Sequence, residues 1–251
     1  MFTIAERDHV RARVIALARA DARVTAGALT GSSALGAEDV WSDVDVAFGI
    51  MDGVTPEAVL HDWTVALDQE FTIIDHFDLH ARSSIYRVFL LPSGLEVDIG
   101  VTPGRDFGAR GPQFQALFGP TQTLEADAPP NAHDLMGLGW HHVLHARSSI
   151  ERGKFWQAEY WISAIRNYTL ALACLRLGEN AHHGRGTDRL PADVTAPLAA
   201  TLVCAITAPE LRRALAAATT CLLREMMASA PALGARCAPL LQEFGAPPPT
   251  P

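Results

Sequence analysis

The 251-residue sequence predicts an α+β protein in which a mixed sheet flanked by helices is followed by an all-helical C-terminal domain. Up to residue 102, short apolar runs bounded by turn residues alternate with stretches of helical spacing. Residues 103–130 are then rich in glycine and proline, and from residue 131 onward the apolar positions follow a helical period alone. Together these observations define the fold class.

The same changes of pattern predict the domain boundaries. We expect an α/β domain over residues 1–102, a linker or wrapping loop over 103–130, and a helical substrate-binding domain over 131–244. Residues 245–251 contain four prolines and are expected to form a disordered tail.

Individual elements have their own signals. Val10 and Val14 recur at helical spacing within residues 5–20, which predicts the first helix. The tripeptide Thr55-Pro56-Glu57 joins a capping residue, a proline and an acid, and predicts a helix from there to about residue 70. Strands are predicted over residues 24–30, 44–50, 72–79, 84–91 and 95–101, and later helices over 132–152, 155–177, 191–206, 208–228 and 231–243.

The charge balance limits the class of partner. The formal net charge is −8. Residues 131–251 hold 9 acidic and 11 basic residues, whereas the first 130 residues hold 19 acidic and 9 basic ones. An acidic protein is a poor partner for long nucleic acids, which are usually met by a basic surface. The acidic half would accept a small cationic substrate.

Cysteine usage and hydropathy predict a cytoplasmic protein. The four cysteines form no CxxC pair and have no histidine at zinc-finger spacing, so we interpret them as reduced thiols. Charged residues such as Glu6, Arg7 and Asp8 interrupt any signal-peptide pattern at the N-terminus. No apolar run reaches the length of a membrane span.

The chemistry is concentrated in one motif. A predicted strand runs into Gly31-Ser32, and ten residues separate Ser32 from Asp43-Val44-Asp45 at the start of the next strand. Residues two apart on a strand share a face, so Asp43 and Asp45 are expected to project together, where only a cation such as Mg²⁺ would relieve their repulsion. Gly31 would let the backbone turn sharply towards a ligand, and Ser32 is expected to cap the short helix that follows, whose free N–H groups favour phosphate.

A third acid appears on a later strand. Asp98 lies between the apolar residues Val97 and Ile99, on a strand that otherwise reads as buried. An isolated ionised carboxylate is costly there, and a metal ion or a proton would relieve the cost. A solvated acidic strand edge would explain the first two acids but leaves Asp98 unexplained. Three carboxylates beside a phosphate-binding turn indicate metal-assisted chemistry at phosphorus.

This pattern of Gly31-Ser32, Asp43-Val44-Asp45 and Asp98 resembles the DNA polymerase β-like nucleotidyltransferase superfamily. The signature covers residues 31–98. The chain length and helical second half look like the antibiotic nucleotidyltransferases that modify aminoglycosides and lincosamides, and there the match is one of architecture only.

The resemblance implies specific roles. Asp43 and Asp45 would bind two Mg²⁺ ions, and Asp98 would bind the catalytic ion and help remove a proton from the acceptor hydroxyl. Gly31 and Ser32 would hold the β- and γ-phosphates of a nucleoside triphosphate, expected to be ATP. The implied reaction transfers a nucleoside monophosphate to a hydroxyl of a small molecule and releases pyrophosphate. The expected partners are thus the nucleotide and a small hydroxylated substrate. No membrane partner is expected, and the protein is expected to be a monomer or a homodimer.

The helical half adds weaker candidates. In the antibiotic-modifying relatives, a glutamate on a C-terminal helix serves as general base and a nearby lysine touches the triphosphate, which makes Glu159 and Lys154 candidates by position. Arg166 lies on the same helical stripe as Glu159 and would either hold phosphate or pair with it. Arg185, in a glycine-punctuated loop, would reach the nucleotide or simply belong to a helix cap. Whether Glu159 or Asp98 is the base stays open.

His141 and His145 have the spacing of a zinc pair, with His142 beside them. No HExxH glutamate lies between the pair, so packing or surface roles are favoured.

Two alternatives to an antibiotic-type enzyme remain. One is a toxin–antitoxin-type or regulatory nucleotidyltransferase that acts on a protein or tRNA, although tRNA would favour a basic face. The other is a non-catalytic nucleotide-binding module, against which the intact Asp43, Asp45 and Asp98 argue.

Overall fold

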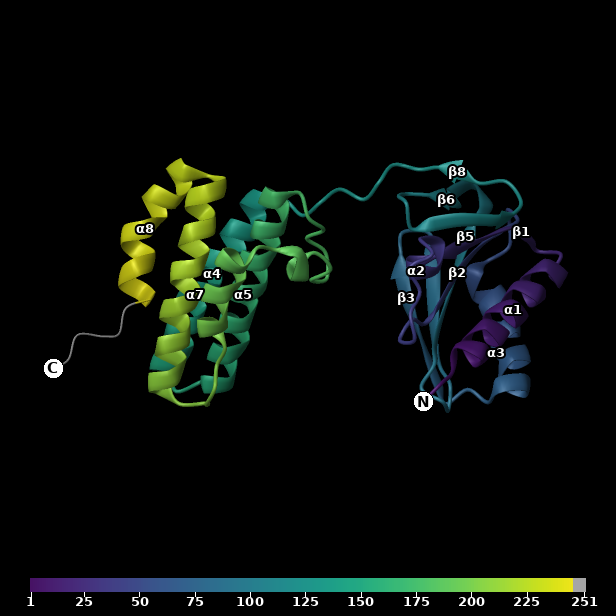
Figure 1. Cartoon of the computed structure of the whole chain (residues 1–251), viewed down its shortest axis with the longest axis horizontal. Coiled ribbons are helices and arrows are strands. Elements are labelled where there is room, and N and C mark those ends of the chain that lie inside the picture. Colours follow the sequence, from purple (N-terminus) through teal and green to yellow (C-terminus); the bar gives the residue numbers. More distant parts are fainter. Residues whose placement is uncertain (246–251) are drawn as a thin grey trace. The chain divides into compact units, whose positions relative to one another are not determined.

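The structure, a computed structural model, describes residues 1–245 and divides the chain into two compact units, Met1–Asp127 and Ala128–Pro251. The α+β fold class predicted from the sequence is confirmed, because a mixed sheet with helices occupies the first unit and helices make up the second (Figure 1). Gly245 ends the last helix, and the rest of the predicted tail lies outside the described residues. No helix within residues 1–245 is long and apolar enough to cross a membrane.

The first unit is built on a six-stranded sheet with the order β3-β4-β5-β2-β1-β7. In this sheet β2 and β5 run parallel, and the other neighbouring strands run antiparallel. The elements are α1 (Ile4–Ala20), β1 (Val24–Thr30), α2 (Gly31–Ala34), β2 (Val44–Ile50), α3 (Pro56–Phe71), β3 (Asp75–Ala81), β4 (Ser84–Leu90), β5 (Glu96–Pro103), the 3₁₀ helix η1 (Gly104–Asp106), β6 (Gly108–Ala109), β7 (Phe114–Phe118) and β8 (Gln122–Thr123).

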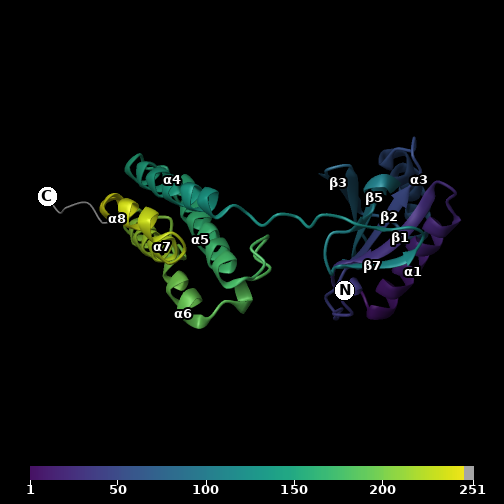
Figure 2. The same ribbon diagram turned by 90° about the horizontal axis from the view of Figure 1, so that it is seen from above.

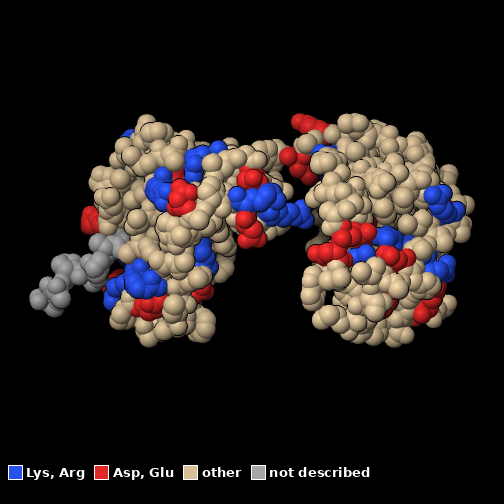
Figure 3. Space-filling view, viewed as in Figure 1, with Lys and Arg blue, Asp and Glu red and all other residues tan. Residues whose placement is uncertain are grey.

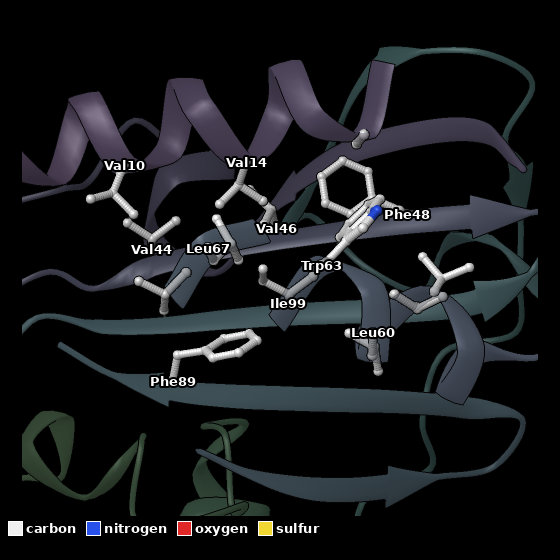
Figure 4. Close-up of a cluster of buried hydrophobic side chains, with 14 of the residues drawn as sticks. Val10, Val14, Val44, Val46, Phe48, Leu60, Trp63, Leu67, Phe89 and Ile99 are labelled. Carbon is white, nitrogen blue, oxygen red and sulfur yellow. The ribbon is translucent and has the colours of Figure 1, made fainter. Parts of the chain in front are cut away.

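Helices α1 and α3 cover one face of this sheet (Figures 1 and 2). Val10 and Val14 of α1 are buried against the sheet, which explains the helical spacing of these valines in the sequence. On the same face, Phe48 of β2 meets Trp63 of α3 edge to face, with 5.2 Å between ring centroids (Figure 4). This core fixes which face of β2 and β5 is left for polar side chains.

The start of α3 follows the predicted cap. The Thr55 hydroxyl accepts a hydrogen bond from the Ala58 N–H, and Pro56 occupies the first turn. The following strand, however, starts three residues later than predicted, at Asp75. The reason is local: Asp68 ends α3 by accepting the Thr72 N–H on its carbonyl and the Ile73 N–H on its side chain, which uses residues that the sequence placed in the strand.

The segment 103–130, predicted as a linker or wrapping loop, contains a strand of the main sheet. β7 pairs antiparallel with β1, with Gly27 opposite Phe118. A Cβ atom on Gly27 would lie 2.5 Å from the Phe118 ring, so the glycine makes room for that ring. The glycine-rich and proline-rich composition concealed Phe114 and Phe118, which anchor this edge strand.

The second unit is helical. Its elements are α4 (Ala132–Glu151), α5 (Phe155–Leu177), η2 (Thr187–Arg189), α6 (Ala192–Thr195), η3 (Ala196–Thr201), α7 (Ala208–Ser229) and α8 (Pro231–Gly245). Four of the five predicted helices match to within two residues. The one predicted over 191–206 is wrong, because the chain forms the short α6 and then η3, in whose first turn Pro197 lacks the N–H that a continuous helix needs. Buried residues such as Ile162, Ile165 and Leu222 join α4, α5 and α7 in one core.

Candidate functional site

The parallel pairing of β2 with β5 places two carboxylates side by side. Val44 and Val46 of β2 are buried in the core, and the alternation of side chains turns Asp45 to the opposite face. The register sets Asp45 opposite Asp98 of β5. Asp43, which directly precedes β2, is half-buried, as are the other two carboxylates. The structure therefore brings together the three acids that the sequence singled out.

Asp98 is the most perturbed group of this cluster. Its Oδ1 atom is buried and has no hydrogen-bond partner. Burial, and then the negative charges of Asp45, Glu96 and Asp43, raise the pKa of Asp98 to about 7. The carboxylate is thus held in a place where a proton or a cation would stabilise it, as its apolar sequence neighbours suggested.

Gly31 brings the backbone against Asp45. Its φ of +60° is in the left-handed region, and a Cβ atom there would lie 2.0 Å from Asp45 Oδ2. Only glycine accepts both the backbone conformation and the contact. The turn at the end of β1 therefore lies directly beside a carboxylate of the site.

The prediction that Ser32 caps the following helix is wrong. The N-cap of α2 is Thr30, and no side chain supplies the cap hydrogen bond. Ser32 instead lies within this four-residue helix, is half-buried, and accepts hydrogen bonds on its carbonyl from the N–H groups of Leu35 and Ala37. Ser32 directly follows Gly31, the residue whose backbone approaches Asp45.

The donor chemistry fits Mg²⁺, although the described residues do not form a finished metal site. No group of three or more His, Cys, Asp or Glu side chains is arranged to hold a metal ion within residues 1–245. The fit rests on the facing pair Asp45 and Asp98, on the unpartnered Asp98 Oδ1 and on the negative charge that Asp43 adds. Carboxylate oxygens are the ligands that Mg²⁺ prefers.

Four candidate residues lie in the helical unit and are described within it. Glu159 Oε1 accepts a hydrogen bond of 2.5 Å from Ser163 Oγ. The same hydroxyl accepts one of 2.9 Å from Arg166 Nη2, while Arg166 Nη1 donates to the Thr201 carbonyl at 3.3 Å. Glu159 and Arg166 are thus joined through a serine. The sequence placed them on one stripe but did not identify the serine between them.

The other two candidates are exposed. Lys154 is the N-cap residue of α5 and makes no side-chain cap hydrogen bond. Arg185 lies in the loop between α5 and η2, where its backbone N–H donates to the His182 carbonyl at 3.1 Å. Both are therefore accessible within their unit.

The three histidines of α4 divide into two kinds. His142 is buried and packs at a tilt against Trp161 and Tyr168, with ring centroids 4.6 and 5.3 Å away. His141 and His145 are exposed and 4.3 Å apart between ring centroids. This arrangement agrees with the packing and surface roles favoured from the sequence.

Sequence reasoning missed Tyr86 of β4. Its register partner is Gly100 of β5, and a Cβ atom there would lie 2.7 Å from the Tyr86 ring. Burial and then the charge of Asp98 raise the pKa of the Tyr86 hydroxyl. The signal available in the sequence was Gly100 itself, because a glycine inside a strand often marks a close approach by another group.

Acidic and basic side chains are mixed on the surface of the Met1–Asp127 unit. On the face drawn in Figure 3 they form a band in which both signs alternate. Ion pairs contribute to this mixture, among them Arg87 with Asp78 and Arg13 with Glu70, each at 2.7 Å. Part of the negative charge counted in the sequence is therefore neutralised locally.

Comparisons with known proteins find distant likeness among solved structures. No protein-family model matches the chain, and no curated protein matches it. Among solved structures, an aminoglycoside 6-adenyltransferase from Bacillus subtilis is similar over 98% of this chain and 100% of its own, with a TM-score of 0.39 and 11% sequence identity. A likeness this distant says nothing about the substrate, metal or mechanism of this chain, which have to be argued from its own side chains.

Proposed function

We propose that the protein transfers a nucleoside monophosphate from a nucleoside triphosphate, ATP in the first instance, to a hydroxyl of a small molecule. The observation that carries this proposal is the facing pair of Asp45 and Asp98, with Gly31 in contact range of Asp45 and with Asp43 directly before β2. Carboxylates gathered beside a glycine turn suit a metal-bound triphosphate. An aminoglycoside-type antibiotic is the acceptor to test first, and resistance would be the biological role.

In this proposal Asp43, Asp45 and Asp98 hold the Mg²⁺ ions. When bound, Mg²⁺ stabilises the charge on the attacking and leaving oxygens of an in-line displacement at the α-phosphorus. Gly31 lets the chain pass close to the phosphates, and Ser32 beside it contacts the β- and γ-phosphates. Each of these contributions belongs to the Met1–Asp127 unit.

Proton removal from the acceptor has two candidates. Asp98, which faces Asp45 across the paired strands β2 and β5, is the candidate of the Met1–Asp127 unit. Glu159 is the candidate of the helical unit, where Ser163 donates a hydrogen bond to its carboxylate. Lys154, Arg166 and Arg185 would contribute positive charge to the nucleotide phosphates.

The proposal is tested by incubating the protein with Mg²⁺, each of the four NTPs and a panel of hydroxylated antibiotics, followed by mass spectrometry. A mass gain of one nucleoside monophosphate identifies both the acceptor and the nucleotide. Asp43→Asn and Asp45→Asn should each abolish the gain, since they remove charge with little change of volume. Asp75→Asn, an exposed acid on β3, is the matched control and should behave as the parent protein. Full transfer by both site variants would overturn the metal assignment.

A further inference from the structure

A buried arginine of α1 contacts the loop that leads into Asp43. Arg7 is only 4% exposed. Its Nη1 atom donates to the carbonyl of Asp39 at 2.6 Å and to that of Ser42 at 3.5 Å, across more than 30 residues of sequence. Both carbonyls belong to the last turn before Asp43. A buried guanidinium that serves two loop carbonyls fixes the path of that loop relative to the helix.

The turn itself is closed by its own side chains. Asp39 Oδ1 accepts the Trp41 N–H at 2.8 Å and the Ser42 hydroxyl at 3.1 Å. The Ser42 Oγ atom in turn accepts the Asp39 N–H at 2.9 Å. Arg7 therefore holds a preformed turn, rather than a flexible segment, and Asp43 follows that turn directly.

A second residue of the loop, Glu38, is tied to the same helix. Glu38 accepts a hydrogen bond from Ser33 Oγ at 2.6 Å and pairs with Arg11 of α1. Its carboxylate also lies 3.7 Å from Arg7 Nε and supplies counter-charge to the buried cation. Ser33 follows Ser32 directly and is itself buried. Helix α1 thus contacts the loop at Glu38, whose partner Ser33 follows the Gly31–Ser32 turn, and again at the turn that precedes Asp43.

We propose that Arg7 is a positioning residue for the nucleotide site: it sets the place of Asp43 relative to the Gly31–Ser32 turn. This rests on the proposed function, in which these two parts of the loop hold metal and phosphate. Arg7 touches neither ligand. It acts through the carbonyls of Asp39 and Ser42, and a shift of about 1 Å in a positioning element is enough to lower a rate by about 10²-fold.

Arg13 of the same helix provides a matched control. It pairs with Glu70 of α3 at 2.7 Å rather than with the loop. It shares its helix, its side-chain type and its ion pairing with Arg7. We would compare Arg7→Met, Arg7→Lys and Arg13→Met with the parent protein, after thermal melts have shown which variants fold. If Arg7→Met fails to fold, Arg7→Lys, which keeps the charge but not the fork of donors, carries the comparison.

The first measurement needs no substrate. Hydrogen exchange of peptides covering residues 35–43 should speed up in the Arg7 variants and stay unchanged in Arg13→Met. The second measurement is steady-state kinetics. We expect kcat to fall by at least about tenfold and the half-saturating Mg²⁺ concentration to rise, with the KM of the acceptor unchanged.

Unchanged exchange in the folded Arg7 variants would overturn the inference whether or not the protein is a transferase. Faster exchange with kinetics equal to those of Arg13→Met would overturn the positioning role while leaving the transferase proposal intact. If the parent protein transfers no nucleotide to any acceptor, the proposed function fails and the positioning role fails with it, although the exchange data would still report the contact of Arg7 with the loop.

Discussion

Asp45 of β2 and Asp98 of β5 occupy the same register position of two parallel strands. The pairs on either side of them, Val44 with Val97 and Val46 with Ile99, point into the core. A shift of either strand by one residue would turn its aspartate into that core and a valine or isoleucine out of it. The hydrophobic core thus fixes the carboxylate pair, because the pattern that buries one face dictates what the other face carries.

Because Gly31 lies so close to Asp45, we predict that alanine at Gly31 lowers activity, whereas alanine at Gly36 affects stability alone. Gly31→Ala and Gly36→Ala both place alanine at a left-handed φ, of +60° and +63°, and this backbone conformation alone should cost each variant about 1 kcal/mol of unfolding free energy. Only at Gly31 does the new Cβ meet a neighbour, the movable Asp45 carboxylate, whereas nothing lies within 4 Å at Gly36. Transfer should therefore fall by about 10²-fold in Gly31→Ala alone.

Urea unfolding and initial rates of transfer test this pair. Equal activity of the two alanine variants would mean that the displaced carboxylate has no part in the reaction.

Because the pKa of Asp98 is raised, we predict that replacing this residue by asparagine stabilises the fold at high pH but not at low pH. The folded pKa is about 7 and the model-compound value is 3.8, so folding favours the protonated form. The stability this group contributes is complete below about pH 4 and is lost as the pH rises through about 7. Asp98→Asn should therefore melt above the parent protein at pH 8 and show no such advantage at pH 4.

Melting curves between these pH values, recorded with EDTA, test this expectation. Asp75→Asn on β3 controls for the loss of one exposed negative charge. A melting-temperature difference between Asp98→Asn and the parent protein that does not change with pH would contradict the burial of an ionised carboxylate at this position.

The sequence predicted the strands that carry the carboxylates because apolar and acidic residues alternate there with the two-residue period of a strand. Val44 and Val46 alternate with Asp43 and Asp45, and this alternation is the same information that the folded strand uses. Alternation does not reveal which strands pair. That β2 lies parallel to β5 in this register depends on contacts between residues 53 positions apart in the sequence.

The features that were missed have the same origin. Arg7 sits three residues before Val10, on the buried stripe of α1, yet a lone arginine on such a stripe does not say which carbonyls it meets. The local composition around Phe118 of β7 predicts a loop, because nothing in it reveals the contact of Phe118 with Gly27. In both cases the local structure depends on contacts with residues that are distant in the sequence.

Within the helical unit, the ion pair of Arg176 with Glu225 predicts a large effect on stability. Glu225 is 3% exposed and accepts two hydrogen bonds from Arg176, at 2.9 and 3.0 Å. Arg176→Met leaves that carboxylate buried and unpaired, which should cost about 3–5 kcal/mol. Arg224→Met removes an exposed pair with Asp193, at 3.4 Å, and should cost less than about 1 kcal/mol.

Urea unfolding followed by circular dichroism would measure both costs. Equal midpoints for the two variants would show that Glu225 finds water or another donor once Arg176 is gone.

The final prediction separates the two candidate bases. If Glu159 accepts the proton of the acceptor, Glu159→Gln should lower kcat by about 10²–10⁴-fold and leave nucleotide binding little changed, because the amide keeps the shape but not the basicity. Ser163→Ala is the matched control: it removes the 2.5 Å hydrogen bond and keeps the carboxylate, so its effect should be much smaller. Single-turnover rates across pH would compare both with Asp98→Asn. A loss below about tenfold in Glu159→Gln, beside an inactive Asp98→Asn, would assign proton removal to Asp98 and leave Glu159 as the carboxylate that, through Ser163, orders Arg166.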